Sequence, residues 1–181
     1  QGFSYAVVAR HIGSDFYPGL GYLNRGNVNL LYNRLEYFWF PASASFIQNH
    51  GFRNKIIGIW NSETGRFETL DNNLVWEALF RSGIRVGANL KIMQENLVNS
   101  FFAGDLEIKR GHYRFSYAEA RFQSSTGAPF QISLKGTAGG YFGGRQWGSE
   151  QSVSWTLSSH LTFSLDNISS TAAIDGQKYR P

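Results

Sequence analysis

Apolar and polar residues alternate with a period of two along much of this chain, and this alternation is the strongest constraint on its fold. The clearest case covers residues 74–93, where Arg81, Ser82 and Gly83 separate two alternating segments. A period of two predicts half-buried β-strands, whereas a helix would repeat every 3.6 residues. Gly83 can supply the left-handed conformation that a three-residue hairpin loop requires. Residues 74–93 are therefore predicted to form a β-hairpin.

The same alternation predicts strands along most of the chain. A second hairpin is predicted near residues 153–165, with its turn at Ser158, Ser159 and His160. Further strands are predicted at residues 3–10, 28–40, 52–61, 101–109, 113–117 and 130–135. A short helical turn is predicted only at residues 93–99. No linker or repeat divides the chain, so residues 1–181 are predicted to be one β-barrel segment, an all-β antiparallel meander of about nine to eleven strands.

Composition excludes several classes of protein. The sequence has no Cys, which rules out disulfides and thiolate chemistry. No apolar run approaches the roughly 18 residues of a membrane-spanning helix. The net charge is +4, but the basic residues are scattered and form no clustered footprint, so no nucleic-acid partner is expected.

The composition of the polar faces favours a transmembrane outer-membrane β-barrel. These faces carry mostly Ser, Thr, Gln, Asn and Gly, without the dense charged coat of a soluble surface. Segments such as 111–125 and 130–139 reach the roughly nine to eleven residues that a tilted spanning strand needs. Aromatic residues near strand ends match the interfacial girdles of such barrels. The predicted interfacial aromatic residues are Trp39, Trp60, Trp76, Tyr141, Phe142 and Trp147.

A soluble periplasmic or secreted barrel is the alternative. In that fold the apolar faces point inward, and an apolar or carbohydrate ligand binds on aromatic walls. Trp76, Trp155 and Phe163 would then line the core or the pocket instead of facing lipid. Periodicity alone does not distinguish the two, because it does not show which face is in water.

Three segments carry a resemblance to a known family. Residues 15–25 read acidic-aromatic-x-Pro-x-x-Gly-aromatic-x-x-Arg, residues 108–115 read apolar-x-x-Gly-x-Tyr-x-aromatic, and residues 139–144 form a glycine-flanked aromatic hairpin tip. In this order the chain resembles bacterial outer-membrane β-barrel proteins of uncharacterised function that carry an N-terminal carbohydrate-binding-family-9-like domain. The chain departs from the family pattern at Asn27, where an acidic residue is common, and in ending at Arg180-Pro181 instead of an aromatic strand.

The resemblance implies a location and partners. It implies the bacterial cell outer membrane, contact with membrane lipid and lipopolysaccharide, and a porin-like pore, an anchor or a docking scaffold linked to glycan binding or uptake. It implies that the chain is an internal piece of a longer barrel. The implied protein partners are an N-terminal carbohydrate-binding domain or another outer-membrane or periplasmic subunit.

The sequence predicts no catalytic, cofactor or metal site, and no enzyme activity is expected. The four His residues are far apart and match no zinc-binding spacing. A third and weaker alternative for the function is an outer-membrane hydrolase, in which His160 and the adjacent Ser158 or Ser159 would form the catalytic pair. Residues this close on a tight turn are more commonly turn formers.

The most suggestive functional feature is electrostatic. Arg85, Lys91, Arg114 and Lys135 are predicted to share the polar face and to face a lumen. A mildly basic lumen would favour anions over cations. The alternative is that these cations pair with Glu77, Glu119 or Glu150 on other strands and fill the barrel.

Overall fold

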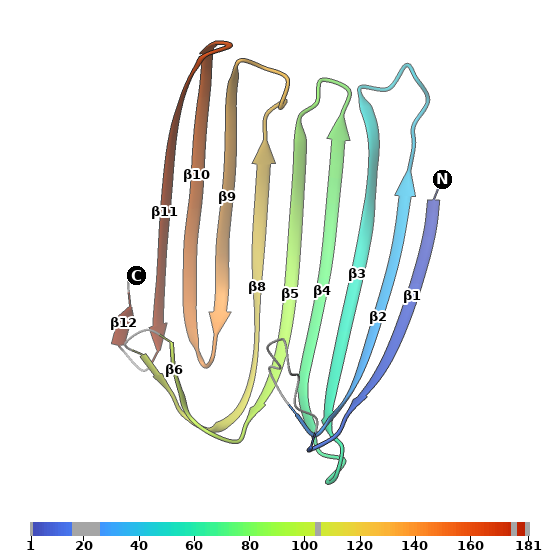
Figure 1. Cartoon of the computed structure of the whole chain (residues 1–181), viewed down its shortest axis with the longest axis vertical. Coiled ribbons are helices and arrows are strands. Elements are labelled where there is room, and N and C mark those ends of the chain that lie inside the picture. Colours follow the sequence, from blue (N-terminus) through green and yellow to red (C-terminus); the bar gives the residue numbers. More distant parts are fainter. Residues whose placement is uncertain (1, 16–25, 104–105, 175–176, 180–181) are drawn as a thin grey trace.

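A computed structural model describes residues 2–15, 26–103, 106–174 and the backbone of 177–179. The strands of this part of the chain are β1 (Gly2–Ile12), β2 (Val28–Trp39), β3 (Ile47–Asn61), β4 (Phe67–Phe80), β5 (Arg85–Leu97), β6 (Phe101–Ala103), β7 (Leu106–Ile108), β8 (Gly111–Gln123), β9 (Phe130–Tyr141), β10 (Gly144–Ser158), β11 (Leu161–Ile174) and β12 (Gln177–Tyr179). Ten of them form one antiparallel sheet in the order β1-β2-β3-β4-β5-β8-β9-β10-β11-β12 (Figure 1). The prediction of an all-β antiparallel meander is confirmed. The sheet is open, with β1 and β12 at its edges.

Tight turns set the register of the predicted hairpins. The β4–β5 turn has Gly83 at φ 85°, as the left-handed position of its loop requires. The β9–β10 turn has two central residues, Phe142 at φ 40° and Gly143 at φ 83°. Two positive φ values in a two-residue loop are typical of the type I′ turn, whose twist matches that of the flanking strands. Both turns therefore hold their strands in direct antiparallel register.

One local prediction was wrong, and another was right only in part. Residues 93–97 are strand and not a helical turn, because β5 is paired with β4 as far as Glu95 and with β8 as far as Leu97. The segment 101–109 forms two short strands, β6 and β7, which pair only with each other. No helix long and apolar enough to cross a membrane occurs among the described residues.

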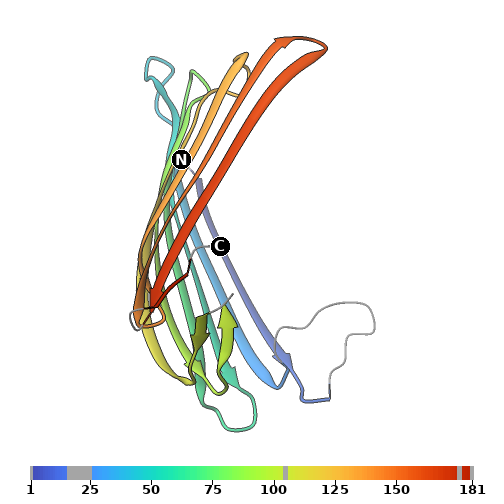
Figure 2. The same ribbon diagram turned by 90° about the vertical axis from the view of Figure 1, so that its left-hand side faces the viewer.

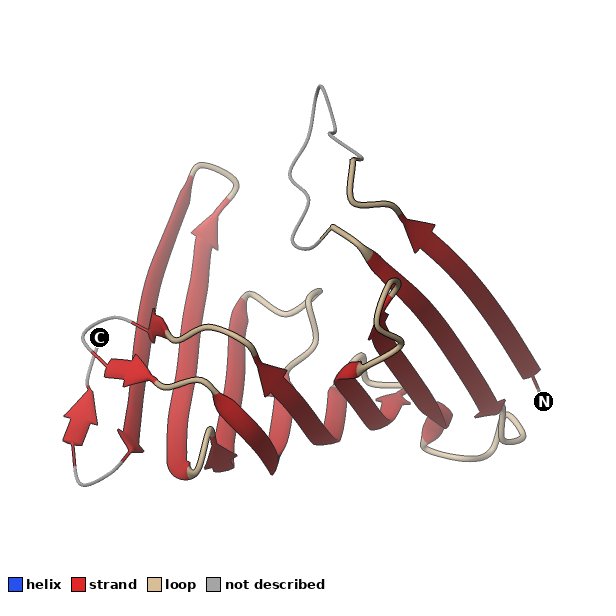
Figure 3. Cartoon of the chain, turned by 90° about the horizontal axis from the view of Figure 1, so that it is seen from below, coloured by secondary structure: helices blue, strands red, loops and turns tan. Residues whose placement is uncertain are grey.

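The sheet is curved, and the β6–β7 hairpin lies on its concave side near the lower end (Figures 2 and 3). The principal buried cluster is at this place: Leu106, Ile108 and Ile174 pack together, with Tyr113 and Tyr141 against them. Apart from this cluster, the described residues form no second layer over either face of the sheet. We call the concave side the inner face and the convex side the outer face.

The register separates charged from apolar residues between these two faces. Directly opposed residues of an antiparallel pair project to the same side, so each ladder can be followed from strand to strand. Most charged residues of the sheet belong to the inner face: Arg10, Arg34, Glu36, Arg53, Lys55, Asp71, Glu77, Arg85, Lys91, Glu95, Glu119, Arg121, Lys135, Glu150 and Asp166. The outer face is rich in large apolar residues: Phe3, Tyr5, Leu31, Leu35, Phe52, Ile56, Leu74, Trp76, Leu90, Leu134, Trp155, Phe163 and Leu165.

Candidate functional site on the inner face

Three of the four cations that were predicted to share a face do so. Arg85, Lys91 and Lys135 lie on the inner face. Arg114 lies opposite Gln94 on the outer face, so its placement with the other three was wrong. The reason is that the lower half of β8 turns its aromatic residues inward, where Tyr113 packs against the β6–β7 hairpin.

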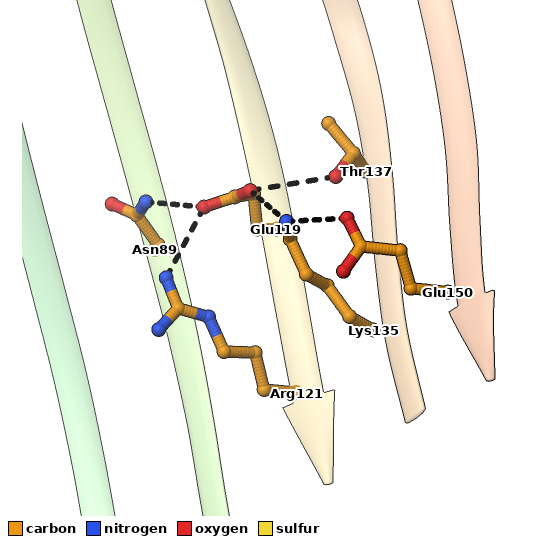
Figure 4. A network of polar contacts seen from close by, with 6 residues as sticks. All are labelled: Asn89, Glu119, Arg121, Lys135, Thr137 and Glu150. Atoms are coloured by element: carbon orange, nitrogen blue, oxygen red, sulfur yellow. Dashed lines mark hydrogen bonds and ion pairs between the residues drawn. The ribbon is translucent and has the colours of Figure 1, made fainter. Parts of the chain in front are cut away.

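Lys135 is held between two carboxylates on the inner face (Figure 4). Its Nζ lies 2.8 Å from Oε1 of Glu150 on β10 and 3.5 Å from Oε1 of Glu119 on β8. Lys91 is also paired, with its Nζ 3.4 Å from Oδ2 of Asp71. Cross-strand pairing, the alternative to a basic lumen, is therefore what the structure shows for Lys135, with two of the predicted partners.

Glu119 is the centre of this network. Its side chain is 14% exposed. Nδ2 of Asn89 donates a hydrogen bond of 2.7 Å to one carboxylate oxygen, and Oγ1 of Thr137 donates one of 3.5 Å to the other. Nη2 of Arg121 lies 3.3 Å from the oxygen that Asn89 also contacts. A half-buried carboxylate is thus surrounded by donors from β5, β8 and β9, which holds these strands in one register.

A second ion-pair chain crosses β2, β3 and β4. The Nε atom of Arg53 donates a hydrogen bond to Glu36, and its Nη2 lies 3.4 Å from Oε1 of Glu77. Arg34 is 3.7 Å from the same Glu36 carboxylate. Sequence reasoning missed this chain, although opposite charges two residues apart at Arg34 and Glu36 were a visible signal. The inner face is therefore largely charge-paired and not uniformly basic.

The six predicted interfacial aromatic residues form three pairs with different surroundings. Trp39 stacks on His50 at a centroid distance of 5.2 Å near the upper end of the sheet, and Trp60 contacts Phe67 edge-on near the lower end. Trp76 and Trp147 project from the outer face. Tyr141 and Phe142 instead pack against the buried cluster under the β6–β7 hairpin. These two residues are part of the inner-side packing and not of an outer band.

Two features bear on the predictions for metal binding and for the Ser158–His160 turn. Among the described residues, no group of three or more His, Asp or Glu side chains is arranged to hold a metal ion. Oγ of Ser158 accepts a hydrogen bond of 3.3 Å from the backbone N–H of His160. This contact is that of a turn former, in line with the more ordinary reading of the turn.

A comparison of the chain with protein-family models, with curated proteins and with solved structures finds no match. The resemblance to outer-membrane barrels with a carbohydrate-binding domain therefore stays a prediction. Residues 16–25, which carry most of its first motif, lie outside the described residues. The third motif forms the β9–β10 turn.

Proposed function

We propose that this chain forms part of the wall of a transmembrane β-barrel in the bacterial outer membrane. In this proposal the outer face contacts lipid and lipopolysaccharide, and the inner face lines an aqueous interior. The role is non-enzymatic: a porin-like pore wall that also anchors the protein in the membrane. A link to glycan binding or uptake, or to a further domain or subunit, rests on the family resemblance alone.

The observation that carries the proposal is the exposure of large apolar side chains on the outer face. Phe163 is 57% exposed and Leu165 is 71% exposed, and apolar residues of this kind recur on neighbouring strands. The chain exposes 12112 Å² in total, whereas a compact monomer of 20.4 kDa would expose about 8,800 Å². An apolar face of this extent is unfavourable in water and favourable in hydrocarbon.

Strand length and polarity support the same arrangement. The nine long strands of the sheet contain 11 to 15 residues, enough for a tilted strand to cross the hydrocarbon layer. In barrels of this kind the lipid-facing residues are apolar and the interior is polar. The inner face, with its ion pairs, fits such an interior.

The soluble barrel has less support, because it needs the apolar face on the concave side. One observation favours it locally. The lower inner face carries Leu30, Tyr32, Ile57 and Ile59, all of them half-buried. This patch is confined to one end of β2 and β3, while the exposed apolar residues of the outer face extend from β1 to β11.

Adjacent residues of β9 provide a matched test. Leu134 lies near the middle of the strand on the outer face, 42% exposed, and Ser133 lies on the inner face opposite Ser152. Leu134→Arg would place a charge in lipid at a cost of about 2 to 4 kcal/mol near the bilayer midplane. Ser133→Arg adds the same side chain to the aqueous side.

The assay is membrane fractionation with urea or carbonate washing and heat-modifiable gel mobility. We expect the wild type and Ser133→Arg to stay with the outer membrane and to shift on boiling, and Leu134→Arg to lose both properties. A wild-type protein that washes off as a soluble species would refute the proposal. Equal behaviour of the two variants would refute the assignment of the faces.

A further inference from the structure

A hollow lies on the inner face where β4, β5 and β8 run side by side, near the upper end of the sheet. Its volume is about 300 Å³. Apolar residues such as Val75 and Leu79 form much of its wall, and six polar or charged residues also line it: Asn49, Glu77, Arg85, Asn89, Arg121 and Gln123. This volume is at the lower end of the range of small-molecule sites. The hollow is separate from the contacts of Lys135 and Glu150, which do not line it.

Gly87 lines the hollow and leaves part of its wall without a side chain. Gly87 lies directly opposite Glu77 on β4 and Arg121 on β8, so a position between two opposite charges has no side chain. The guanidinium of Arg121 extends from β8 toward β5 (Figure 4). A Cβ atom at Gly87 would lie 3.3 Å from the backbone oxygen of Trp76, tighter than an ordinary contact. A larger residue here would occupy the hollow and strain its wall.

Asn89 lines the hollow and has a buried acceptor on its side chain. This residue is 7% exposed, and the hydrogen bond from its Nδ2 to Glu119 fixes the orientation of the amide. Its Oδ1 is buried and has no hydrogen-bond partner among the described residues. Figure 4 shows this oxygen on the side of the amide away from Glu119. A buried acceptor without a partner is costly, so a donor from a bound molecule would be stabilising there.

Arg85 is a cation at the hollow that has no ion pair with a described residue. It lines the hollow, and its side chain is exposed. Arg121 stands diagonally across the β5–β8 ladder from it, within reach of a long side chain. Two guanidinium groups beside one hollow are suited to a carboxylate, which each can bind through paired N–H donors.

We propose that this hollow binds a small hydroxylated carboxylate, of which a sugar acid is the simplest kind. The carboxylate lies against Arg85 and Arg121, one hydroxyl donates to Oδ1 of Asn89, and another donates to the Glu77 carboxylate. Neutral sugars lack the group that the guanidinium pair recognises. The inference deepens the proposed function and rests on it, because the inner face must be in contact with water.

The test is calorimetric titration of the full chain in detergent with glucuronate and with glucose, which differ only at the carboxylate carbon. We expect glucuronate to bind about tenfold or more tightly than glucose, because the charged hydrogen bonds are made only with the acid. Arg85→Gln should weaken glucuronate binding about tenfold. Lys55→Gln is the matched control, because Lys55 is a cation of the same face that does not line the hollow.

Equal binding of the two sugars, or equal effects of the two substitutions, would overturn the inference. Because Arg85 is exposed at a strand end, its replacement leaves the packing intact, and heat-modifiable mobility of each variant verifies the fold. The two proposals fail separately. A protein that stays in the membrane but does not bind glucuronate refutes only the ligand, and one that binds glucuronate but washes off the membrane refutes only the barrel.

Discussion

Removing the Glu119 carboxylate is the sharpest test of the inner-face network. Glu119→Ala leaves Nδ2 of Asn89 without its acceptor, and Asn89 is almost fully buried. Leaving a buried donor unsatisfied costs about 1 to 3 kcal/mol. The ion pairs with Arg121 and Lys135 add little, about 0 to 1 kcal/mol, because both cations are partly exposed and solvent screens them. The expected total is about 2 kcal/mol.

Two control variants separate the hydrogen bond from the charge. Glu119→Gln keeps an acceptor for Asn89 and loses only the ionic part, so we expect a loss of about 1 kcal/mol or less. Glu150→Gln removes the other partner of Lys135, but that carboxylate is half exposed, so we expect about 0 to 1 kcal/mol. The predicted order of destabilisation is Glu119→Ala, then Glu119→Gln, with Glu150→Gln near the wild type.

The assay is equilibrium urea unfolding in lipid vesicles, followed by the fluorescence of the five Trp residues. With a slope of about 2 kcal/mol per molar urea, a loss of 2 kcal/mol lowers the midpoint by about 1 M. If Glu119→Ala shifts the midpoint no more than Glu150→Gln does, the buried hydrogen bond to Asn89 contributes nothing and the reasoning fails.

Two further predictions concern the β6–β7 hairpin and its surroundings. Ile108→Ala, at a residue only 1% exposed, should cost about 2 to 5 kcal/mol and expose the hairpin to limited proteolysis, whereas Ala at the exposed Phe102 should leave the cleavage rate unchanged. Phe142→Gly removes the strain of a positive φ, about 1 kcal/mol, but also removes a ring that contacts Phe101 and Tyr113. We therefore expect net destabilisation in the same urea assay. A stabilised variant would show that the backbone strain outweighs the ring packing.

The local parts of the fold were predictable from the sequence. The β4–β5 hairpin follows from its alternation and from Gly83, and the structure confirms both its strands and its turn. The β10–β11 hairpin is equally plain, with Trp155 opposite Phe163 on one face. In both cases the turn is short and the sequence alternates up to it, so local sequence determines the pairing, although the β10–β11 ladder has one register shift between Thr156 and Ser158.

The face of β8 was not predictable in this way. Tyr113, Phe115 and Tyr117 alternate with polar residues, which indicates an apolar side but not its direction. The structure turns this side inward, because Tyr113 belongs to the cluster that Leu106 and other residues of the β6–β7 hairpin complete. The direction in which the apolar side of β8 faces depends on its contact with the β6–β7 hairpin, and no local sequence pattern predicts that contact. The error in placing Arg114 has the same origin.

The pairing of Lys135 with Glu150 was predictable from the sequence. Lys135 and Glu150 are equally distant in sequence from the two-residue turn of Phe142 and Gly143, so a direct register places them opposite each other. The number of cations on the polar face suggested a basic lumen. The register that a two-residue turn imposes predicts instead that Lys135 lies opposite Glu150. The pairing of Arg53 with Glu36 was not predictable in this way. Their strands are joined by a longer connection, residues 40–46, and a connection of this length does not fix the register by itself.

If the inner face lines a pore, as we propose, charge pairing changes how it can select a solute. A wall whose cations are mostly neutralised by neighbouring carboxylates exerts little net field on ions in the lumen, since opposite charges within a few ångströms cancel at longer range. Selectivity must then come from particular places where a charge is left unpaired beside unused hydrogen-bonding groups. Among the described residues, the hollow lined by Arg85 and Asn89 is such a place, because Arg85 has no ion pair and Oδ1 of Asn89 has no hydrogen-bond partner. A pore built in this way would discriminate by local hydrogen bonding and shape, so its preference would depend on the chemistry of the solute more than on its charge alone.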